Sequence, residues 1–345
     1  MQLNMPLRNL AVLASLLIGA TASAEITGQQ RAEAAGRDLL GSPAPRLVVK
    51  TIDGDTIDLG SLYGKKAVYI KFWATWCVPC RQQMPHFQHT YETAGPDLAV
   101  IAVNVGFNDS VPEIRKYQKQ LGITMPIVFD GDAALAAAFN VRVTPQHIVI
   151  GRDGRIQYVG HLADQPLDAA LIAARAPDTD KAHAKGAAER KAVVAQHYAM
   201  GDPLPKTTVH TLDGRTFHFQ QQGLKGPTVL VFLSPWCESY LATTRPEVSA
   251  NCRAAREQVS ALSQSTDVRW LGVASGLWVT PEDLREYQKK YQIGIPLSLD
   301  ESGELFREFG VNNTPIMIVA DAKGNIIHRV ETDKSQTLPQ VLHGS

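Results

Sequence analysis

Short apolar runs alternate with amphipathic stretches along the whole chain. In the first half, apolar runs at 66–73, 98–105 and 143–150 predict β-strands. The run at 98–105 is almost uninterrupted, as expected of a strand that is buried on both faces. Helices are expected at 111–121 and 133–139. Strands that alternate with helices in this way predict an α/β fold, in which helices flank a sheet.

The second half of the chain repeats the first. The matched pairs are 51–56 with 211–216 and Trp76-Cys77 with Trp236-Cys237, at an offset of 160, then 117–120 with 287–290 and Thr144-Pro145 with Thr314-Pro315, at an offset of 170. The chain therefore holds two copies of one fold, and the second copy has ten extra residues between its cysteine and its next strand.

A change of composition separates the two copies. Residues 173–203 are rich in alanine, lysine and other charged residues, which is typical of a linker. We therefore expect a lead-in at 25–42, a first domain at 43–172 and a second domain at 204–345. The length of 345 residues also favours two domains over one.

The first 24 residues have the pattern of a signal peptide. Arg8 precedes an apolar run at 10–20, and Ala22-Ser23-Ala24 supplies the small residues of a cleavage site. The run is short for a membrane span, so we expect cleavage after Ala24 and export to the periplasm. The alternative is an uncleaved anchor, which would be the chain's only membrane contact.

The overall charge is balanced, with 34 Lys and Arg against 34 Asp and Glu. This balance excludes nucleic acids and acidic membranes as partners on grounds of charge. Only four cysteines occur, too few for a disulfide-stapled scaffold of this length. We therefore expect the thiols to be chemically active.

Cys77 and Cys80 form a Cys-x-x-Cys pair where the strand at 66–73 passes into a helix. Exposed N–H groups at a helix start favour the thiolate of Cys77, and Cys80 lies one turn further along the same helix face. Pro79 restricts the loop, and Trp76 offers an apolar surface to a partner. No second cysteine pair follows in this half, so the spacing favours thiol–disulfide exchange, with neither a metal nor a cofactor.

Thr144-Pro145 is the second notable element of this half. A proline at the head of a strand is expected at an edge or in a turn. With a cis bond, it would expose the backbone of Thr144 for pairing with an extended peptide.

Residues 72–81, together with Pro85 and Thr144-Pro145, resemble the TlpA-like branch of the thioredoxin-fold disulfide reductases. The resemblance covers residues 43–171, nearly one whole domain. With the internal repeat, it implies two tandem thioredoxin-like domains, each a central mixed β-sheet flanked by helices.

The resemblance also implies roles for these residues. Cys77 would be the nucleophile, Cys80 the resolving thiol and Pro145 a cis-proline beside them, while Thr144 would tune the reduction potential and dock substrate. Exported members of this branch act on disulfides of other exported proteins, such as apocytochromes or copper-site assembly proteins. A membrane thiol donor keeps them reduced.

Lys71 departs from the thioredoxin pattern, which has a buried acid on this strand. One interpretation is an ammonium group that reaches the domain surface. The other is a positive charge that lowers the pKa of Cys80.

The second copy keeps Cys237 but has Tyr240 in the place of the second cysteine. Cys252 follows fifteen residues after Cys237, roughly 22 Å away on one continuous helix, whereas a disulfide allows about 4.4 to 6.8 Å between Cα atoms. If residues 238–245 form a loop and a helix starts at Pro246, Cys252 could fold back onto Cys237. The sequence leaves both arrangements open.

Three roles for the second copy remain open. It could bind substrate or partner through Trp236, Tyr240 and Thr314-Pro315. It could relay electrons through Cys237 and Cys252. Cys237 could also act as a peroxidatic cysteine, although the threonine and arginine usual around such a cysteine are not evident.

The function expected for the whole chain is that of an exported thiol–disulfide oxidoreductase, most simply a reductase. The alternative from another class is a metallochaperone or scaffold in which Cys77 and Cys80 hold Cu(I).

Overall fold

The computed structural model describes residues 26–176, 197–264, 267–331 and 338–343. The predicted signal peptide at 1–24 and most of the predicted linker lie outside these residues. Among the helices that the structure describes, none combines the length and hydrophobicity needed to cross a bilayer.

The first domain is built on a five-stranded sheet in the order β5-β4-β3-β6-β7. Its strands are β3 (Ala67–Trp73), β4 (Leu98–Asn104), β5 (Ile127–Phe129), β6 (Gln146–Ile150) and β7 (Ile156–Gly160). The central strand β3 is parallel to β4 and antiparallel to β6, so the sheet is mixed. All seven residues of β3 are buried, which accounts for its apolar sequence.

Helices and a hairpin complete this domain. They are α1 (Gly28–Gly36), β1 (Val48–Lys50), β2 (Thr56–Asp58), α2 (Leu59–Leu62), α3 (Val78–Glu92), α4 (Val111–Leu121), α5 (Ala134–Ala138) and α6 (Gln165–Ala174). The helices expected at 111–121 and 133–139 are present as α4 and α5. The strand expected at 143–150 begins only at Gln146, because a cis-proline turn comes first.

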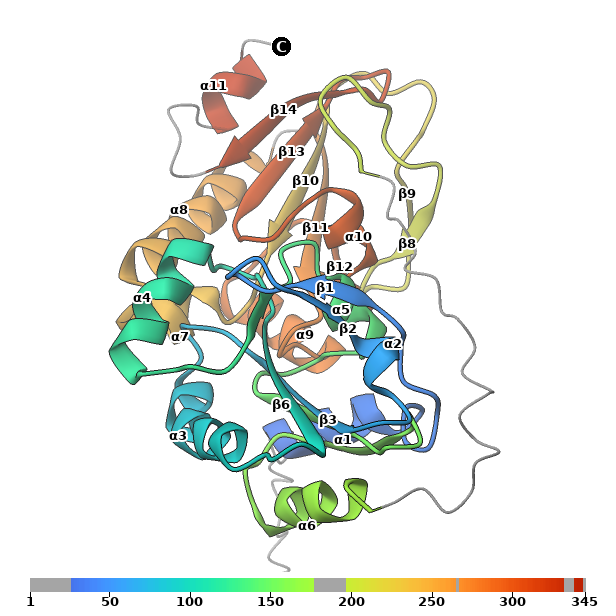
Figure 1. Ribbon diagram of the computed structural model, residues 1–345. Coiled ribbons are helices and arrows are strands. Elements are labelled where there is room, and N and C mark those ends of the chain that lie inside the picture. Colours follow the sequence, from blue (N-terminus) through green and yellow to red (C-terminus); the bar gives the residue numbers. More distant parts are fainter. Residues whose placement is uncertain (1–25, 177–196, 265–266, 332–337, 344–345) are drawn as a thin grey trace, which may run out of the picture.

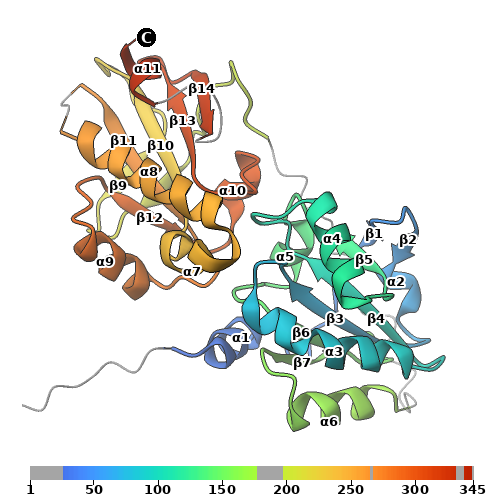
Figure 2. The same ribbon diagram turned by 90° about the vertical axis from the view of Figure 1, so that its left-hand side faces the viewer.

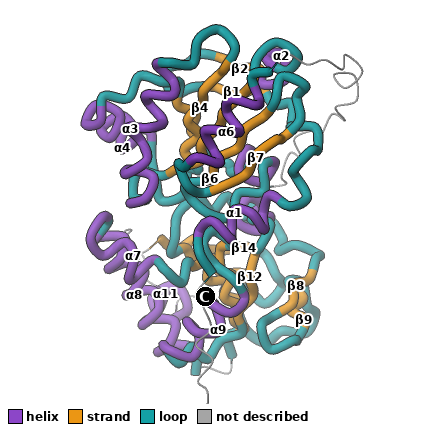
Figure 3. Tube along the Cα trace, turned by 90° about the horizontal axis from the view of Figure 1, so that it is seen from below, coloured by secondary structure: helices purple, strands orange, loops and turns teal. Residues whose placement is uncertain are grey.

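The second domain repeats this architecture with the sheet order β12-β11-β10-β13-β14. Its elements are β8 (Thr208–His210), β9 (Thr216–His218), β10 (Thr228–Leu233), α7 (Cys237–Thr244), α8 (Pro246–Leu262), β11 (Arg269–Ser275), α9 (Pro281–Lys290), β12 (Leu297–Asp300), α10 (Glu304–Glu308), β13 (Ile316–Ala320), β14 (Ile326–Glu331) and α11 (Leu338–His343). Strand β10 is again parallel to one neighbour and antiparallel to the other. The predicted tandem of mixed-sheet α/β domains is therefore confirmed (Figures 1 and 3).

The main difference between the copies is the helix after the central strand. The first domain has one helix, α3, whereas the second has two, α7 and α8, with a break at Arg245. Figure 2 shows α7 turned toward the first domain, near α4. The extra residues of the second copy thus build a short helix at the domain interface.

The two domains face each other through equivalent loops. The N–H of Asn108, after β4, donates to the carbonyl of Asn312 (2.8 Å), and the N–H of Trp278, after β11, donates to the carbonyl of Arg142 (2.9 Å). Asn108 and Trp278 are 170 positions apart, as are Arg142 and Asn312, and both donors have positive φ angles. Each loop therefore makes the same contact with the other domain, as in a twofold dimer.

An apolar cluster runs through this interface. The ring of Phe107 lies 6.0 Å from Phe306 and 6.1 Å from Trp236, and Trp76 stacks on Trp236 at 5.0 Å. Helix α1 also bridges the domains, because it packs on β7 and its Arg31 pairs with Asp283 at 2.9 Å (Figure 2). The domain interface is therefore continuous with the core of the first domain.

Arg245 links the break between α7 and α8 to the first domain. Its guanidinium lies 2.9 Å from the fully buried carboxylate of Asp109 and 2.5 Å from Glu113, and it also donates to the hydroxyl of Thr75. Burial raises the pKa of Asp109, while hydrogen bonds and the Arg245 charge act in the opposite direction. The cation is thus the charge partner of a carboxylate that water does not reach.

Arg245→Met should lower the free energy of unfolding by about 3 kcal/mol, because it leaves the buried carboxylate of Asp109 without its cation. Chemical denaturation followed by fluorescence measures the loss. Arg285→Met is the matched control, since Arg285 and Glu282 form an exposed pair whose loss should cost less than about 0.5 kcal/mol. Equal effects of the two substitutions would show that the Arg245 contact contributes nothing to docking.

Candidate active site

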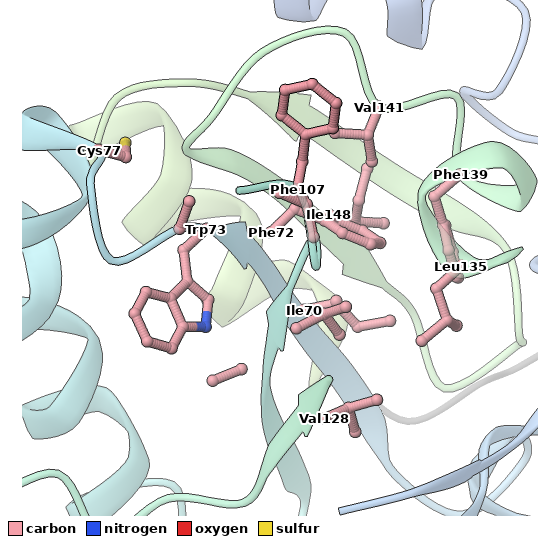
Figure 4. Packing of buried hydrophobic residues seen from close by; sticks show 14 of the residues in the cluster. Ile70, Phe72, Trp73, Cys77, Phe107, Val128, Leu135, Phe139, Val141 and Ile148 are labelled. Carbon is pink, nitrogen blue, oxygen red and sulfur yellow. The ribbon is translucent and has the colours of Figure 1, made fainter. Parts of the chain in front are cut away.

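The dithiol lies at the junction of β3 and α3, as predicted. Cys77 is the N-cap of α3 and forms a disulfide with Cys80, with 5.2 Å between their Cα atoms. The backbone N–H of Cys80 points to Cys77 Sγ at 3.2 Å. On reduction, the same N–H and the helix start stabilise a thiolate on Cys77. Figure 4 shows Cys77 at the margin of the core formed by Phe72 and Trp73.

The Thr144–Pro145 peptide bond is cis and lies beside the dithiol. Cys77 Sγ is 3.3 Å from the carbonyl oxygen of Thr144. The proline occupies the turn before β6, which is the position expected of a proline at the head of a strand. The structure therefore brings together Cys77, Cys80, Thr144 and Pro145, four of the residues that the sequence singled out in this half.

The second domain covers this loop. The indole Nε1–H of Trp278 donates to Thr144 Oγ1 (3.2 Å), and its backbone N–H donates to the carbonyl of Arg142 (2.9 Å). Thr144 is consequently fully buried. The expectation that its backbone would be exposed is wrong for this arrangement of the domains, because the Trp278 loop packs over Thr144 and hydrogen-bonds to its side chain. The internal repeat did not predict that Trp278 contacts the Thr144 loop, because the equivalent residue of the first domain is Asn108, which has no indole ring.

The second domain also contacts the Cys-x-x-Cys loop itself. The N–H of Val78 donates to the hydroxyl of Tyr240 at 3.1 Å. Tyr240, which replaces the second cysteine of the motif in its own domain, thus caps the helix that carries the dithiol of the other. Trp236 stacks on Trp76, so both predicted recognition residues meet the first active site directly.

Cys77 still reaches an open groove, although only 1% of its surface is exposed. One wall comes from α4 and the other from the end of α7. The lining residues are Thr75, Trp76, Cys77, Val78, Arg81, Glu113, Lys116, Tyr117, Gln120, Thr243, Thr244 and Arg245. A second, aromatic cleft of about 590 Å³ lies beside Pro79 and is lined by Trp76, Trp236, Tyr240, Trp278, Tyr287 and Tyr291 among others.

A buried polar network supports the cis-proline loop from behind. His161 Nδ1 donates to the carbonyl of Pro145 (2.7 Å), and Gln83 of α3 donates to the carbonyl of His161 (3.1 Å). Gln83 Oε1 in turn accepts from His147 Nε2 (2.8 Å), whose Nδ1 accepts from the hydroxyl of Tyr69 (2.8 Å). Burial lowers the pKa of both histidines, so the network is uncharged at neutral pH.

Lys71 lies inside the domain, and the interpretation that its ammonium reaches the surface is wrong. Its side chain is fully buried, and Nζ has no hydrogen-bond partner among the described residues. Nζ lies 5.3 Å from the centre of the Phe87 ring. Burial lowers the pKa of Lys71 to about 7, because no anion compensates for the lost hydration. Near neutral pH the amine therefore exists in both charged and neutral forms.

The second domain also contains a disulfide. Cys237 of α7 and Cys252 of α8 are joined, with 6.2 Å between their Cα atoms. Of the two arrangements left open by the sequence, the structure has the one with a helix start at Pro246, but residues 237–244 form α7 in place of a loop at 238–245. The break at Arg245 lets α8 fold back, which brings the two cysteines together. The Thr314–Pro315 bond is cis, like its counterpart.

A mixed sheet, a dithiol at a helix start and a cis-proline beside it define the first domain as a thioredoxin-fold thiol–disulfide oxidoreductase. The chain belongs to the AhpC/TSA family, whose model matches residues 40–159 and again residues 200–329, once in each domain.

Several relatives are similar to about a third of the chain. Thiol-disulfide oxidoreductase ResA of Bacillus subtilis is 32% identical over 117 residues, which cover 34% of this chain and 64% of ResA. Thioredoxin-like protein YneN of the same organism is 34% identical over 134 residues, or 38% of this chain and 78% of YneN. ResA of Halalkalibacterium halodurans is 31% identical over 131 residues, covering 37% of this chain and 73% of that protein. The match thus spans less than two thirds of the first of these relatives.

Among solved structures, a thiol:disulfide interchange protein of the thioredoxin family from Chlorobium tepidum is 30% identical. The alignment covers 39% of this chain and 97% of that protein, with a TM-score of 0.35. The sequence relatives confirm the predicted resemblance to the thioredoxin-fold disulfide reductases.

Lys71→Met should stabilise the protein by a few kcal/mol at pH 7 and below, where the buried amine carries its charge. An unperturbed lysine has a pKa of 10.5 and Lys71 in the folded protein has a pKa of about 7, so the unfolded chain binds more protons between these values. The free energy of unfolding of the wild type therefore rises with pH between about 7 and 10.5. The difference in stability between Lys71→Met and the wild type shrinks over the same range.

Urea unfolding of the wild type and Lys71→Met at pH 6, 8 and 10 tests this. Lys65→Met is the control, because Lys65 is an exposed lysine of the same segment and its loss should leave the pH dependence unchanged. A pH-independent difference between wild type and Lys71→Met would mean that Lys71 does not titrate as described.

Proposed function

We propose that this protein is an exported reductase of disulfides in other exported proteins. The observation that carries the proposal is the position of Cys77 Sγ, at the start of α3, 3.3 Å from the cis-proline loop and in contact with an open groove. The apolar run at 10–20 supports export. The named relatives support the reaction class.

The reaction consists of two exchanges. The Cys77 thiolate attacks one sulfur of the client disulfide, and the other client sulfur leaves as a thiolate. Cys80 then attacks Cys77 Sγ, which releases the second client thiol and forms the Cys77–Cys80 disulfide seen in the structure. Two electrons pass from the enzyme to the client. A membrane thiol donor would restore the enzyme dithiol.

The second domain supports partner binding in this proposal. It supplies Trp236, Tyr240 and Trp278 to the aromatic cleft beside Pro79, and Thr243 to Arg245 to the groove at Cys77. Aromatic side chains with large apolar surfaces are suited to hold an extended client segment while its disulfide meets Cys77.

The two alternatives have less support. Among the described residues, no group of three or more His, Cys, Asp or Glu is arranged to hold a metal ion, so a Cu(I) chaperone would rely on Cys77 and Cys80 alone. Peroxide reduction at Cys237 would need access to a sulfur that is fully buried and joined to Cys252. No specific observation favours either function.

Cys77→Ser should abolish insulin reduction with dithiothreitol as the electron source, because the attacking sulfur is lost. Cys80→Ser should retain the first exchange and accumulate a mixed disulfide with the client, visible on non-reducing gels. Cu(I) titration of the wild type provides the comparison. Undiminished turnover in Cys77→Ser, or tight Cu(I) binding without insulin reduction in the wild type, would contradict the proposal.

Trp236→Ala should raise the KM for a protein disulfide several-fold while the rate with the small hydroxyethyl disulfide stays near that of the wild type. The reason is that only the larger substrate extends into the aromatic cleft. Ile172→Ala is the control, since Ile172 is 75% exposed on α6, away from the cleft. An equal loss of activity with both substrates would mean that Trp236 holds the Cys77–Cys80 loop in place, through Trp76, and does not bind the client.

A further inference from the structure

The second disulfide lies against the second cis-proline loop. Cys252 Sγ is 3.7 Å from the carbonyl oxygen of Thr314, the residue before cis-Pro315. In the first domain, Cys77 Sγ has the same relation to the carbonyl of Thr144, at 3.3 Å. The two sulfurs thus occupy corresponding places beside corresponding loops, although Cys252 lies far along the chain from the position that repeats Cys77.

Cys237, which does repeat Cys77 in sequence, lies elsewhere. Its sulfur is 3.8 Å from the carbonyl of Val248, between α7 and α8, and the residue is fully buried. Cys252 retains 9% of its surface. In the first domain the sulfur beside the cis-proline loop belongs to the first cysteine of the pair, Cys77. In the second domain it belongs to the second cysteine, Cys252.

The two helices that carry these cysteines are joined in a way that maintains this arrangement. The hydroxyl of Ser249 donates to the carbonyl of Glu238 at 2.6 Å, and Arg256 donates to the carboxylate of Glu238 at 2.6 Å. Both contacts cross between α7 and α8 on either side of Cys252. The helix pair is therefore held by polar contacts as well as by the disulfide.

Cys252 lines a small cavity together with two charged residues, Glu238 and Arg256. Arg253 follows it directly, and Arg256 lies one turn further along α8. Both arginines face Glu238, at 3.9 and 2.6 Å, and Arg256 also lies 3.5 Å from Glu257, so the four charged groups balance one another. Ser234, Tyr287 and Pro315 complete a small cavity that Cys252 lines. Arg256 is the cation of this cavity that would stabilise a thiolate on Cys252 as it forms.

We propose that Cys237–Cys252 is a second redox site, which accepts electrons from a thiol donor and in which Cys252 is the sulfur attacked first. A donor thiolate forms a disulfide with Cys252 Sγ, the Cys237–Cys252 bond breaks, and Cys237 takes up the electron pair and a proton. A second donor thiol attacks the donor sulfur of this mixed disulfide and releases Cys252. Two donor thiols become a disulfide, and the domain gains a dithiol.

Reduced glutathione is the probe for this site, used on the full chain carrying Cys77→Ala and Cys80→Ala so that the first site is silent. After a short incubation, free thiols are blocked with N-ethylmaleimide and the adducts are mapped by mass spectrometry. We expect glutathione on Cys252 and the blocking group on Cys237. Glutathione chiefly on Cys237 would overturn the proposal, as would a disulfide that resists concentrations that reduce Cys77–Cys80 in the wild type.

Single substitutions in the same background give a second measurement. In Cys237→Ser the remaining Cys252 should react with 5,5′-dithiobis(2-nitrobenzoate) at least ten-fold faster than the remaining Cys237 does in Cys252→Ser. Circular dichroism checks that both variants are folded. Equal rates, or a faster Cys237, would contradict the assignment. Neither measurement depends on the activity of the first domain. A negative result here would therefore leave the proposed reductase function at Cys77 and Cys80 untouched.

Discussion

Two reciprocal backbone hydrogen bonds, Asn108 to Asn312 and Trp278 to Arg142, hold each cis-proline loop against the other domain. Each bond adds only about 1 kcal/mol net, so the apolar contacts of Phe107, Trp236 and Phe306 supply most of the favourable free energy. The hydrogen bonds instead fix how the two domains are aligned with each other, because they form only when these loops lie opposite one another. The two hydrogen bonds are equivalent under the internal repeat. The same loop conformation, present once in each domain, therefore forms both contacts of the interface.

This docking separates two kinds of access that a single thioredoxin-like domain would offer together. The sulfur of Cys77 meets a groove between α4 and α7, whereas the Thr144 loop lies under Trp278. A small disulfide needs only the groove. A client that pairs its backbone with the loop must first displace the Trp278 contacts, so its binding free energy has to exceed their contribution. In the proposed function, the second domain would therefore discriminate between substrates by size, while the exchange reaction would take place in the first domain.

The sequence was sufficient for features that depend on local pattern and repetition. The buried run of β3, the dithiol at its end and the repeated Thr-Pro pairs predict the sheet, the site and the duplication, because each is encoded within a few residues. The roles of Trp278, Arg245 and His161 could not be predicted, since each depends on contacts with residues more than fifteen positions away. Lys71 was misplaced because strand alternation gives the direction of a side chain but not the thickness of the layer above it.

The altered dithiol of the second domain follows from the same interface. A helix like α3 would place a cysteine at position 240, but Tyr240 there caps the start of α3 in the other domain. A cysteine at this position would not supply the hydroxyl that accepts from Val78, and the break at Arg245, which pairs with the buried carboxylate of Asp109, turns α8 back toward Pro315. The second cysteine then reaches the cis-proline loop from the opposite direction. Tyr240 in place of the vicinal cysteine and Cys252 beside the loop thus both belong to the elements that dock against the first domain.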